Sequence, residues 1–230
     1  MSAIIVGAGP GLGAALAMRF GQNGEPVAVI SRTSESTRKL LDDAKACEVN
    51  IRAFHADAGS RSSLVQGLSA AMKWAGSPSV LIYNAASFNE ETAETLDIEA
   101  LERDFAVNVV GAVQSVQAVL PDMIARASGT ILLTSGGLAL NPVAAWSSLA
   151  MGKAALRAYA YSLHKSVLDR GINVATVTIC GLIEAGGLFD PHRIAEEYWR
   201  LHAQPRAGFV PELVYSPEGA RLDYNDAKAD

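Results

Sequence analysis

Short apolar segments alternate with longer segments of helical periodicity along most of this chain. Strands are expected over residues 3–6, 27–30, 51–55, 80–83, 130–134 and 173–179. Helices are expected over residues 11–20, 36–46, 62–74, 98–126 and 147–169. Nearly continuous apolar strands are typical of a parallel sheet that is buried on both faces. The alternation therefore predicts an α/β fold, a single Rossmann-type doubly wound parallel sheet flanked by helices.

Residues 1–215 are expected to form one domain, because no linker or repeat interrupts the alternation. The polar segment 216–230 is expected to be a flexible tail. Residues 183–211 break the rhythm, with paired glycines and a proline followed by Ile194, Tyr198 and Leu201 at helical spacing. An excursion of this kind after the last regular strand often forms a substrate lid. A plain surface helix is an equally good interpretation.

Composition and charge argue against several classes of partner. The formal net charge is −5 and the basic residues are scattered, so no nucleic-acid partner is expected. There is no leader pattern, and no apolar run approaches the roughly 20 residues that span a bilayer. Cys47 and Cys180 form no CxxC pattern, and no cluster of histidine, cysteine and aspartate has the spacing of metal ligands. We therefore expect a reduced cytoplasmic protein without a metal site or membrane contact.

The first expected strand runs into a glycine-rich turn in the segment IIVGAGPGLGAALAMRF. Gly7, Gly11 and Gly13 give the pattern GxxxGxG, whereas Leu12 takes the sixth position of the commoner GxGxxG. Such glycines let the backbone approach a pyrophosphate closely, and the N-terminus of the following helix offers free N–H groups to the phosphates. The turn therefore favours a dinucleotide-binding site over a purely structural turn.

The second expected strand ends in VAVISRTSES, which bears on the choice of dinucleotide. A site for NAD usually places an acidic residue there, where it accepts hydrogen bonds from the adenosine ribose. This chain has Ser31 and then Arg32, whose guanidinium would pair with a 2′-phosphate. The pair favours NADP(H) over NAD, although a solvated loop arginine would have the same sequence.

Several separate motifs between residues 3 and 181 resemble the short-chain dehydrogenase/reductase family. GAGPGLG resembles the family's TGxxxGxG, HADAG its segment with an adenine-contacting aspartate (here Asp57), and YNAA its NNAG beginning at Asn84. FAVNVVGA carries Asn108 at the position of the family's helix-four asparagine, and ILLTSGG ends the strand that bears its catalytic serine. GKAALRAY is similar to the segment around the family's catalytic lysine, which is Lys153.

The resemblance implies a set of residues around a bound NADP(H). The cofactor-binding candidates are Gly7, Gly11, Leu12, Gly13, Ser31, Arg32, Asp57, Ala58, Asn84, Ala85, Ala86, Lys153 and Gly181. The catalytic candidates are Asn108, Ser135 and Lys153. The resemblance also implies a homodimer or homotetramer, assembled through the long helices around Asn108 and Lys153.

The catalytic centre departs from the family pattern. In the family the lysine binds the nicotinamide ribose and lowers the pKa of a tyrosine four residues earlier, on the same helix face. In this chain that position is Leu149. The usual position of the serine is Gly136, with Ser135 one residue earlier, and the threonine of the family's PGxxxT is replaced by Ala185. The general acid and base of the family is therefore missing.

Three functions are compatible with this pattern. The first is an NADP(H)-dependent oxidoreductase, a reductase of a small organic substrate, whose proton comes from another group. The candidates for that group are Ser135, Tyr83, Tyr198, His202, Glu184 and a water held by Asn108 and Lys153. The second is a lyase or isomerase that reuses the pocket, and the third is a catalytically silent NADP(H)-binding protein. We favour the first, in which an electron-poor C=C or C=N bond becomes more plausible because it needs less acid help than a ketone.

Overall fold

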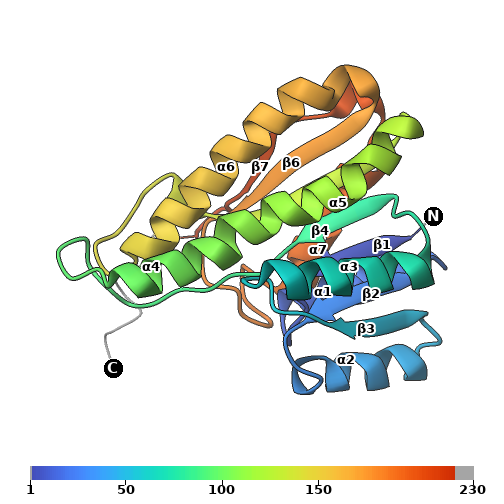
Figure 1. Cartoon of the computed structure of the whole chain (residues 1–230), viewed down its shortest axis with the longest axis horizontal. Coiled ribbons are helices and arrows are strands. Elements are labelled where there is room, and N and C mark those ends of the chain that lie inside the picture. Colours follow the sequence, from blue (N-terminus) through green and yellow to red (C-terminus); the bar gives the residue numbers. More distant parts are fainter. Residues whose placement is uncertain (1, 221–230) are drawn as a thin grey trace.

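The computed structural model describes residues 2–220, which form a parallel sheet with helices on both faces (Figure 1). The strands are β1 (Ala3–Val6), β2 (Val27–Ser31), β3 (Ile51–His55), β4 (Val80–Tyr83), β5 (Gly129–Gly136), β6 (Ile172–Ile179) and β7 (Glu212–Tyr215). Their order is β3-β2-β1-β4-β5-β6-β7, and each neighbouring pair is parallel. The predicted doubly wound fold is therefore confirmed. Most of the predicted polar tail, residues 221–230, lies outside the described residues.

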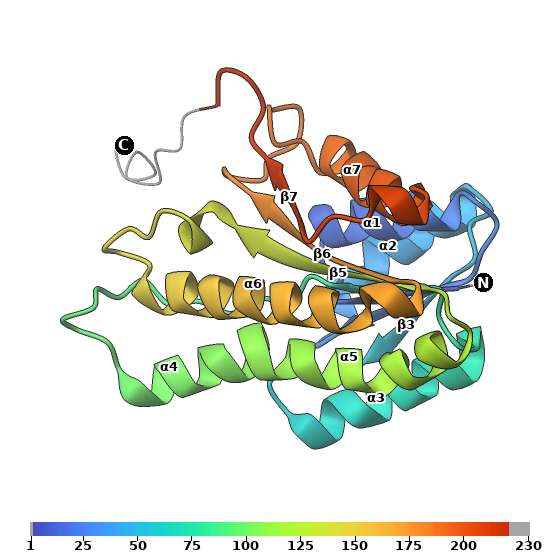
Figure 2. The same ribbon diagram turned by 90° about the horizontal axis from the view of Figure 1, so that it is seen from above.

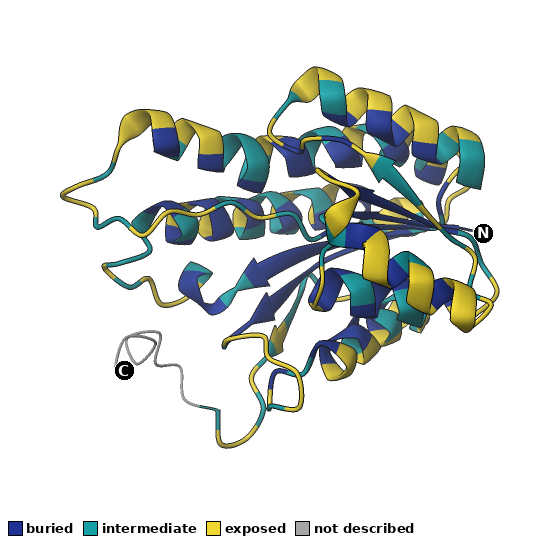
Figure 3. Ribbon diagram, turned by 90° about the horizontal axis from the view of Figure 1, so that it is seen from below, coloured by how far each residue is buried: buried dark blue, intermediate teal, exposed yellow. Residues whose placement is uncertain are grey.

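Two layers of helices cover the sheet (Figure 2). One face carries α1 (Leu12–Gly21), α2 (Glu35–Ala46) and α7 (Pro191–Ala203), and the other carries α3 (Arg61–Ala75), α5 (Gly111–Ala125) and α6 (Ser147–Val167). The central strands are buried between these layers, and the exposed residues gather on the outward faces of the helices and in the loops (Figure 3). Double burial explains the nearly continuous apolar sequence of the strands.

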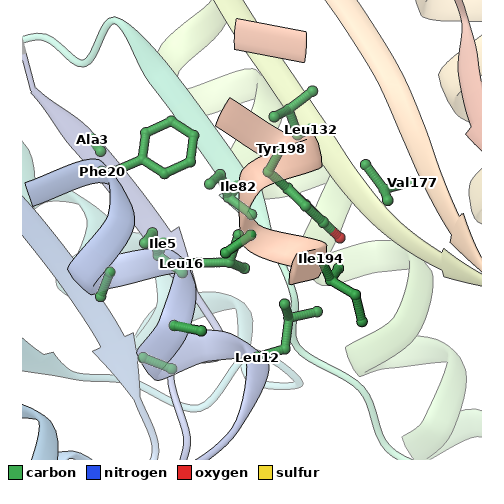
Figure 4. Packing of buried hydrophobic residues seen from close by; sticks show 14 of the residues in the cluster. Ala3, Ile5, Leu12, Leu16, Phe20, Ile82, Leu132, Val177, Ile194 and Tyr198 are labelled. Carbon is green, nitrogen blue, oxygen red and sulfur yellow. The ribbon is translucent and has the colours of Figure 1, made fainter. Parts of the chain in front are cut away.

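Helix α7 packs against the sheet and contributes to the hydrophobic core. Its Ile194 and Tyr198 are fully buried and pack in one cluster with Leu16 and Phe20 of α1 (Figure 4). The amphipathic helix expected within residues 183–211 is therefore present, and it covers one face of the sheet. The loop 182–188, which precedes α7, is exposed at most of its positions. The substrate lid remains a prediction, and we place it in this loop.

The predicted helix over residues 98–126 is continuous but changes its geometry in the middle. It consists of α4 (Ile98–Phe105), a π-helical turn (Ala106–Val110) and α5. By length and composition alone, the helix Ile98–Ala125 is long and apolar enough to cross a membrane, although polar and charged residues interrupt its apolar sequence. Its apolar character has another cause in this fold, because Val116, Val119 and Met123 are fully buried in the core beneath the sheet.

Strand β7 was not predicted from the sequence. It has only four residues and forms a parallel edge strand next to β6. Its Glu212 carboxylate accepts hydrogen bonds from Arg157 Nε at 2.8 Å, Arg157 Nη2 at 2.7 Å, Tyr161 Oη at 2.7 Å and Thr178 Oγ1 at 2.6 Å. Burial by itself raises the pKa of Glu212, but these hydrogen bonds outweigh it and lower the pKa to about 2. One carboxylate therefore fixes the edge strand to α6.

The substitution Glu212→Gln tests this anchor. It leaves Arg157 without its carboxylate, so we expect the free energy of unfolding at pH 7 to fall by about 2 kcal/mol. The folded pKa of Glu212 lies below the unfolded value of 4.5, so its stabilisation is complete above pH 4.5 and is lost as the pH falls towards 2. Urea unfolding of the wild type and of Glu212→Gln should therefore show a difference in the free energy of unfolding that narrows below pH 5. Glu94→Gln, at an exposed loop position, is the control. A difference that is independent of pH would contradict the assignment.

Candidate active site

A cavity of about 630 Å³ lies at the carboxyl ends of β4, β5 and β6, beside the glycine-rich turn after β1. The strand order reverses between β1 and β4, which is where open α/β sheets form their ligand crevice. The polar side chains that line the cavity are mainly Asn84, Thr134, Ser135 and Lys153, and most of the remaining lining is apolar. A mostly apolar cavity with a few convergent polar groups is typical of a site for a small organic molecule.

The glycine-rich turn has the geometry that a dinucleotide needs. A Cβ atom on Gly7, which has φ +91°, would lie 2.2 Å from Ala85 N, and one on Gly13 would lie 2.8 Å from Gly7 O. These glycines therefore permit close packing of the turn against the sheet. Gly11, at the N-terminus of α1, has φ +113° and open space where a Cβ atom would lie, and no side chain caps the helix. This open helix N-terminus is a cradle that fits a pyrophosphate.

The residues predicted for the adenosine end lie after the adjacent strands β2 and β3. Ser31 is buried, and its hydroxyl donates to Thr33 O at 2.9 Å. Arg32 is exposed, and no ion pair among the described residues engages it. Asp57 accepts a hydrogen bond from Gly59 N at 2.9 Å, which orders the loop after β3. Arg32 therefore remains available to a phosphate, as the NADP(H) prediction requires.

Asn84 ties the turn to the neighbouring strands. Its Nδ2 donates to Gly7 O at 2.9 Å, and its Oδ1 accepts from Thr134 Oγ1 at 3.0 Å. Thr134 Oγ1 also shares a 2.7 Å hydrogen bond with Tyr198 Oη from α7. Burial raises the pKa of Tyr198 far above its usual value, so this phenol stays protonated. Tyr198 therefore supports Thr134, which lines the cavity. Tyr198 itself does not line the cavity.

Lys153 enters the cavity from α6 and is only 8% exposed. Its Nζ donates to the backbone oxygen of Thr134 at 2.9 Å, and no carboxylate among the described residues pairs with it. Burial lowers the pKa of Lys153 to about 8. Leu149, one helical turn earlier, lines the same cavity, as does Ser135, whose Oγ lies 3.5 Å from Lys153 O. The structure thus brings Lys153, Leu149 and Ser135 together.

Asn108 lies in the π-helical turn and does not line the cavity. Its Oδ1 accepts from Ser87 N at 2.9 Å, and its Nδ2 donates to Ser87 O at 2.7 Å. A Cβ atom on Gly152 would lie 3.0 Å from Asn108 Cβ, so the glycine lets α6 approach. The side-chain amide of Asn108 therefore clamps the loop after β4. It is already engaged and is poorly suited to hold a catalytic water.

The other candidate proton donors lie away from the cavity. Tyr83 donates to Val107 O, and His202 forms a 3.0 Å hydrogen bond with Thr130, at the opposite end of β5. Glu184 is exposed in the loop before α7. Neither these residues nor Tyr198 line the cavity, whereas Ser135 does. Gly181 also lines it, but a Cβ atom there would meet the Phe189 ring at 2.1 Å, so packing alone requires this glycine.

One part of the site was missed from the sequence. The Asp104 carboxylate is 1% exposed and accepts hydrogen bonds from Ser148 Oγ at 2.6 Å, Ser87 Oγ at 2.8 Å and Asn89 Nδ2 at 3.3 Å. These bonds hold the loop that carries Phe88 against the start of α6. The one sequence feature that pointed to this carboxylate was its position one helical turn before Asn108.

An aromatic pair forms one wall of the cavity. Phe88 and Trp146 both line it, and their rings pack edge to face with centroids 5.4 Å apart. Phe88 comes from the loop after β4 and Trp146 from the residue before α6, so the wall depends on how these two segments are held together.

The sequence of the chain is similar to those of several known proteins. The profile of the short chain dehydrogenase family matches residues 1–188. The 2,5-dichloro-2,5-cyclohexadiene-1,4-diol dehydrogenase LinX of Sphingobium indicum is 26% identical over 180 residues, which cover 78% of this chain and 72% of LinX. Short-chain dehydrogenase/reductase 3 of Homo sapiens is 27% identical over 176 residues, which cover 76% of this chain and 58% of that protein.

Solved structures show the same fold. A metagenomic short-chain oxidoreductase in complex with NADP superposes with a TM-score of 0.86 at 23% identity, covering 94% of this chain and 96% of the other. An alcohol dehydrogenase from the archaeon Thermococcus sibiricus, complexed with 5-hydroxy-NADP, gives a TM-score of 0.84 at 20% identity, covering 97% and 99%.

The buried charge of Lys153 should lower the stability of the protein. Burial lowers the folded pKa from 10.5 to about 8, so the charged form opposes folding below pH 8. With roughly 1.4 kcal/mol for each tenfold change in proton affinity, we expect Lys153→Met to raise the free energy of unfolding at pH 7 by about 3 kcal/mol. The gain should shrink between pH 8 and 10.5, because the wild-type lysine then folds uncharged. Urea unfolding at pH 7 and 10 measures both effects. Lys165→Met, at an exposed position of the same helix, should change little, and a destabilised Lys153→Met chain would refute the argument.

Proposed function

Because the chain belongs to the short-chain dehydrogenase family, we propose that it is an NADP(H)-dependent oxidoreductase that reduces a small organic substrate. The observation that carries the proposal is the convergence of Lys153, Ser135 and Asn84 on one cavity beside the glycine-rich turn. We further propose that the catalytic centre is altered, since Leu149 stands where the family's acid–base tyrosine is expected.

The residues present suit the cofactor along its whole length. The open N-terminus of α1 at Gly11 would hold the pyrophosphate, Arg32 the 2′-phosphate, and the loop of Asp57 the adenine. One N–H group of Lys153 could meet a nicotinamide ribose hydroxyl, which leaves another for the substrate. When bound, the cofactor supplies a hydride to the substrate in the cavity. The preference for NADP(H) is supported by Arg32 and by the two NADP-type ligands in solved structures of the same fold.

The chain's own residues would orient the substrate and provide its proton. Ser135 presents a hydroxyl to the cavity and can donate a hydrogen bond to a substrate heteroatom. Leu149 offers no proton, so the acid must be Lys153, Ser135 or a water beside them. An apolar wall of Phe88 and Trp146 favours a substrate with an apolar body. NADP(H) binding accompanied by non-redox turnover would instead indicate a lyase or isomerase.

Arg32→Ala tests the choice of cofactor. A charge-assisted pair with a phosphate is worth about 1.5–3 kcal/mol, so wild-type chain should bind NADPH roughly ten- to over a hundredfold more tightly than NADH. The variant should lose most of this preference while its affinity for NADH stays unchanged. Fluorescence titration with both cofactors gives the ratio. Arg38→Ala, an exposed arginine of α2, is the matched control. Equal binding of NADPH and NADH by the wild type would remove the NADP(H) assignment.

Leu149→Tyr tests the altered centre. It places a phenol one helical turn from Lys153, where the nearby charge favours the phenolate. General acid–base help is typically worth about 10²–10⁴-fold, so NADPH-dependent reduction of simple ketones should rise by that order. Leu149→Phe supplies the same ring without the hydroxyl and should show no gain. If the wild type already reduces simple ketones efficiently and Leu149→Tyr brings no improvement, Leu149 does not mark an altered centre.

A further inference from the structure

Lys153 is the only ionisable side chain among the described residues that line the cavity. Around it lie Leu149, Leu138, Trp146 and Phe189, which contribute apolar surface. A site without a carboxylate cannot neutralise a cationic substrate, and a single cation among apolar walls suits an apolar molecule with one electron-rich atom that can carry negative charge. The electrostatics of the cavity thus centre on one ammonium group.

The ammonium group has donors to spare. A lysine Nζ carries three N–H groups, of which Thr134 O accepts one at 2.9 Å. No other hydrogen bond from Nζ is made within the described residues. The hydroxyl of Ser135, which also lines the cavity, lies on the neighbouring strand end. Lys153 and Ser135 therefore present donors to the same cavity.

Resting on the proposed function, we propose that the substrate is a neutral, apolar α,β-unsaturated carbonyl compound whose conjugated C=C bond is reduced. In this assignment Lys153 is the catalytic residue that donates a hydrogen bond to the carbonyl oxygen and supplies the proton.

The step balances with the groups that the site and the proposed function supply. The β-carbon gains a hydride from the cofactor, and the electron pair of the C=C bond moves to form an enolate. Its charge develops on the carbonyl oxygen beside the Lys153 ammonium, which is preorganised by Thr134 O. One proton passes from Nζ to this oxygen, and the enol formed becomes the saturated carbonyl compound. Water returns a proton to the neutral amine. Burial lowers the pKa of Lys153 to about 8, so the ammonium predominates at neutral pH and gives up its proton readily.

The same geometry disfavours simple ketones. Hydride addition to a ketone produces an alkoxide, a much stronger base than an enolate, so it depends more on a positioned proton donor. That donor would come from the position of Leu149, which has only an aliphatic side chain. An enolate spreads its charge over oxygen and carbon, and a hydrogen-bonded cation is sufficient to stabilise it.

A matched pair of probes tests the substrate class. 4-Phenyl-3-buten-2-one and 4-phenyl-2-butanone differ only in the conjugated C=C bond, and the second is the expected product of the first. With NADPH and the whole chain, we expect conversion of the enone to 4-phenyl-2-butanone at least about tenfold faster than any reduction of 4-phenyl-2-butanone, by gas chromatography. Lys153→Met should lower this rate by about 10²-fold or more, and Lys165→Met should not change it. An allylic alcohol as the main product would overturn the proposal.

Binding of 4-nitrophenol gives a readout that needs no turnover. Its phenolate resembles an enolate and absorbs visible light, so its protonation can be followed when it is bound. An opposite charge within about 4–6 Å should lower the pKa of the bound phenol by about 1–3. The shift should vanish in Lys153→Met, with and without NADP⁺, and persist in Lys165→Met. A shift that survives in Lys153→Met overturns the role of the lysine.

The two proposals fail in different ways. If neither NADPH nor NADH binds, the proposed function is wrong. If NADPH binds, but the enone is not reduced or the phenol shows no shift, only the present inference is wrong. Folding of Lys153→Met is checked by its unfolding transition, which should lie above that of the wild type.

Discussion

The side chain and backbone of Asn84 join the carboxyl ends of three neighbouring strands, and the site is built on this junction. Its backbone N–H donates to Val6 O at 2.7 Å, its Nδ2 to Gly7 O, and its Oδ1 accepts from Thr134. Thr134 then extends the junction in two directions, since its backbone oxygen holds Lys153 and its hydroxyl meets Tyr198. The glycine-rich turn, the ammonium group and helix α7 therefore share one hydrogen-bonded frame.

Helix α6 carries two cationic side chains on one face, and their surroundings differ. Lys153 and Arg157 are one turn apart, but Arg157 meets the Glu212 carboxylate in a two-pronged ion pair, whereas the one hydrogen bond of Lys153 Nζ within residues 2–220 goes to a backbone oxygen. The first arrangement fixes an edge strand to the helix. The second leaves a charge in apolar surroundings, which costs stability and concentrates the field of the charge on whatever enters the cavity. This contrast is typical of functional residues that stability alone would not select.

The sequence predicted the parts of the fold that depend on local pattern. Six strands and the main helices follow from apolar periodicity, because double burial of a parallel sheet imposes it on each strand. The edge strand β7 was not predicted, because four residues with a single neighbouring strand show little apolar periodicity. The strand is held instead by hydrogen bonds between Glu212 and residues distant in the sequence. Motif spacing also singled out Lys153, Ser135 and Asn84, and the structure places these three residues in the lining of one cavity. It could not show that Asn108 and Asp104 clamp a loop, because side-chain pairing between distant segments leaves no period in the sequence.

The loop 182–188 leaves apolar side chains in water next to the cavity. Leu182 is 76% exposed and Leu188 is 44% exposed. Two residues after the loop, the Asp190 carboxylate caps α7 and accepts a hydrogen bond from Gly186 N. These hydrogen bonds fix the loop to the start of α7, while the apolar side chains of the loop remain in contact with water. Any ligand that covers these leucines removes apolar surface from water, so its association with the protein has a negative heat-capacity change. The temperature dependence of the binding enthalpy therefore reports on how completely this loop covers a bound molecule.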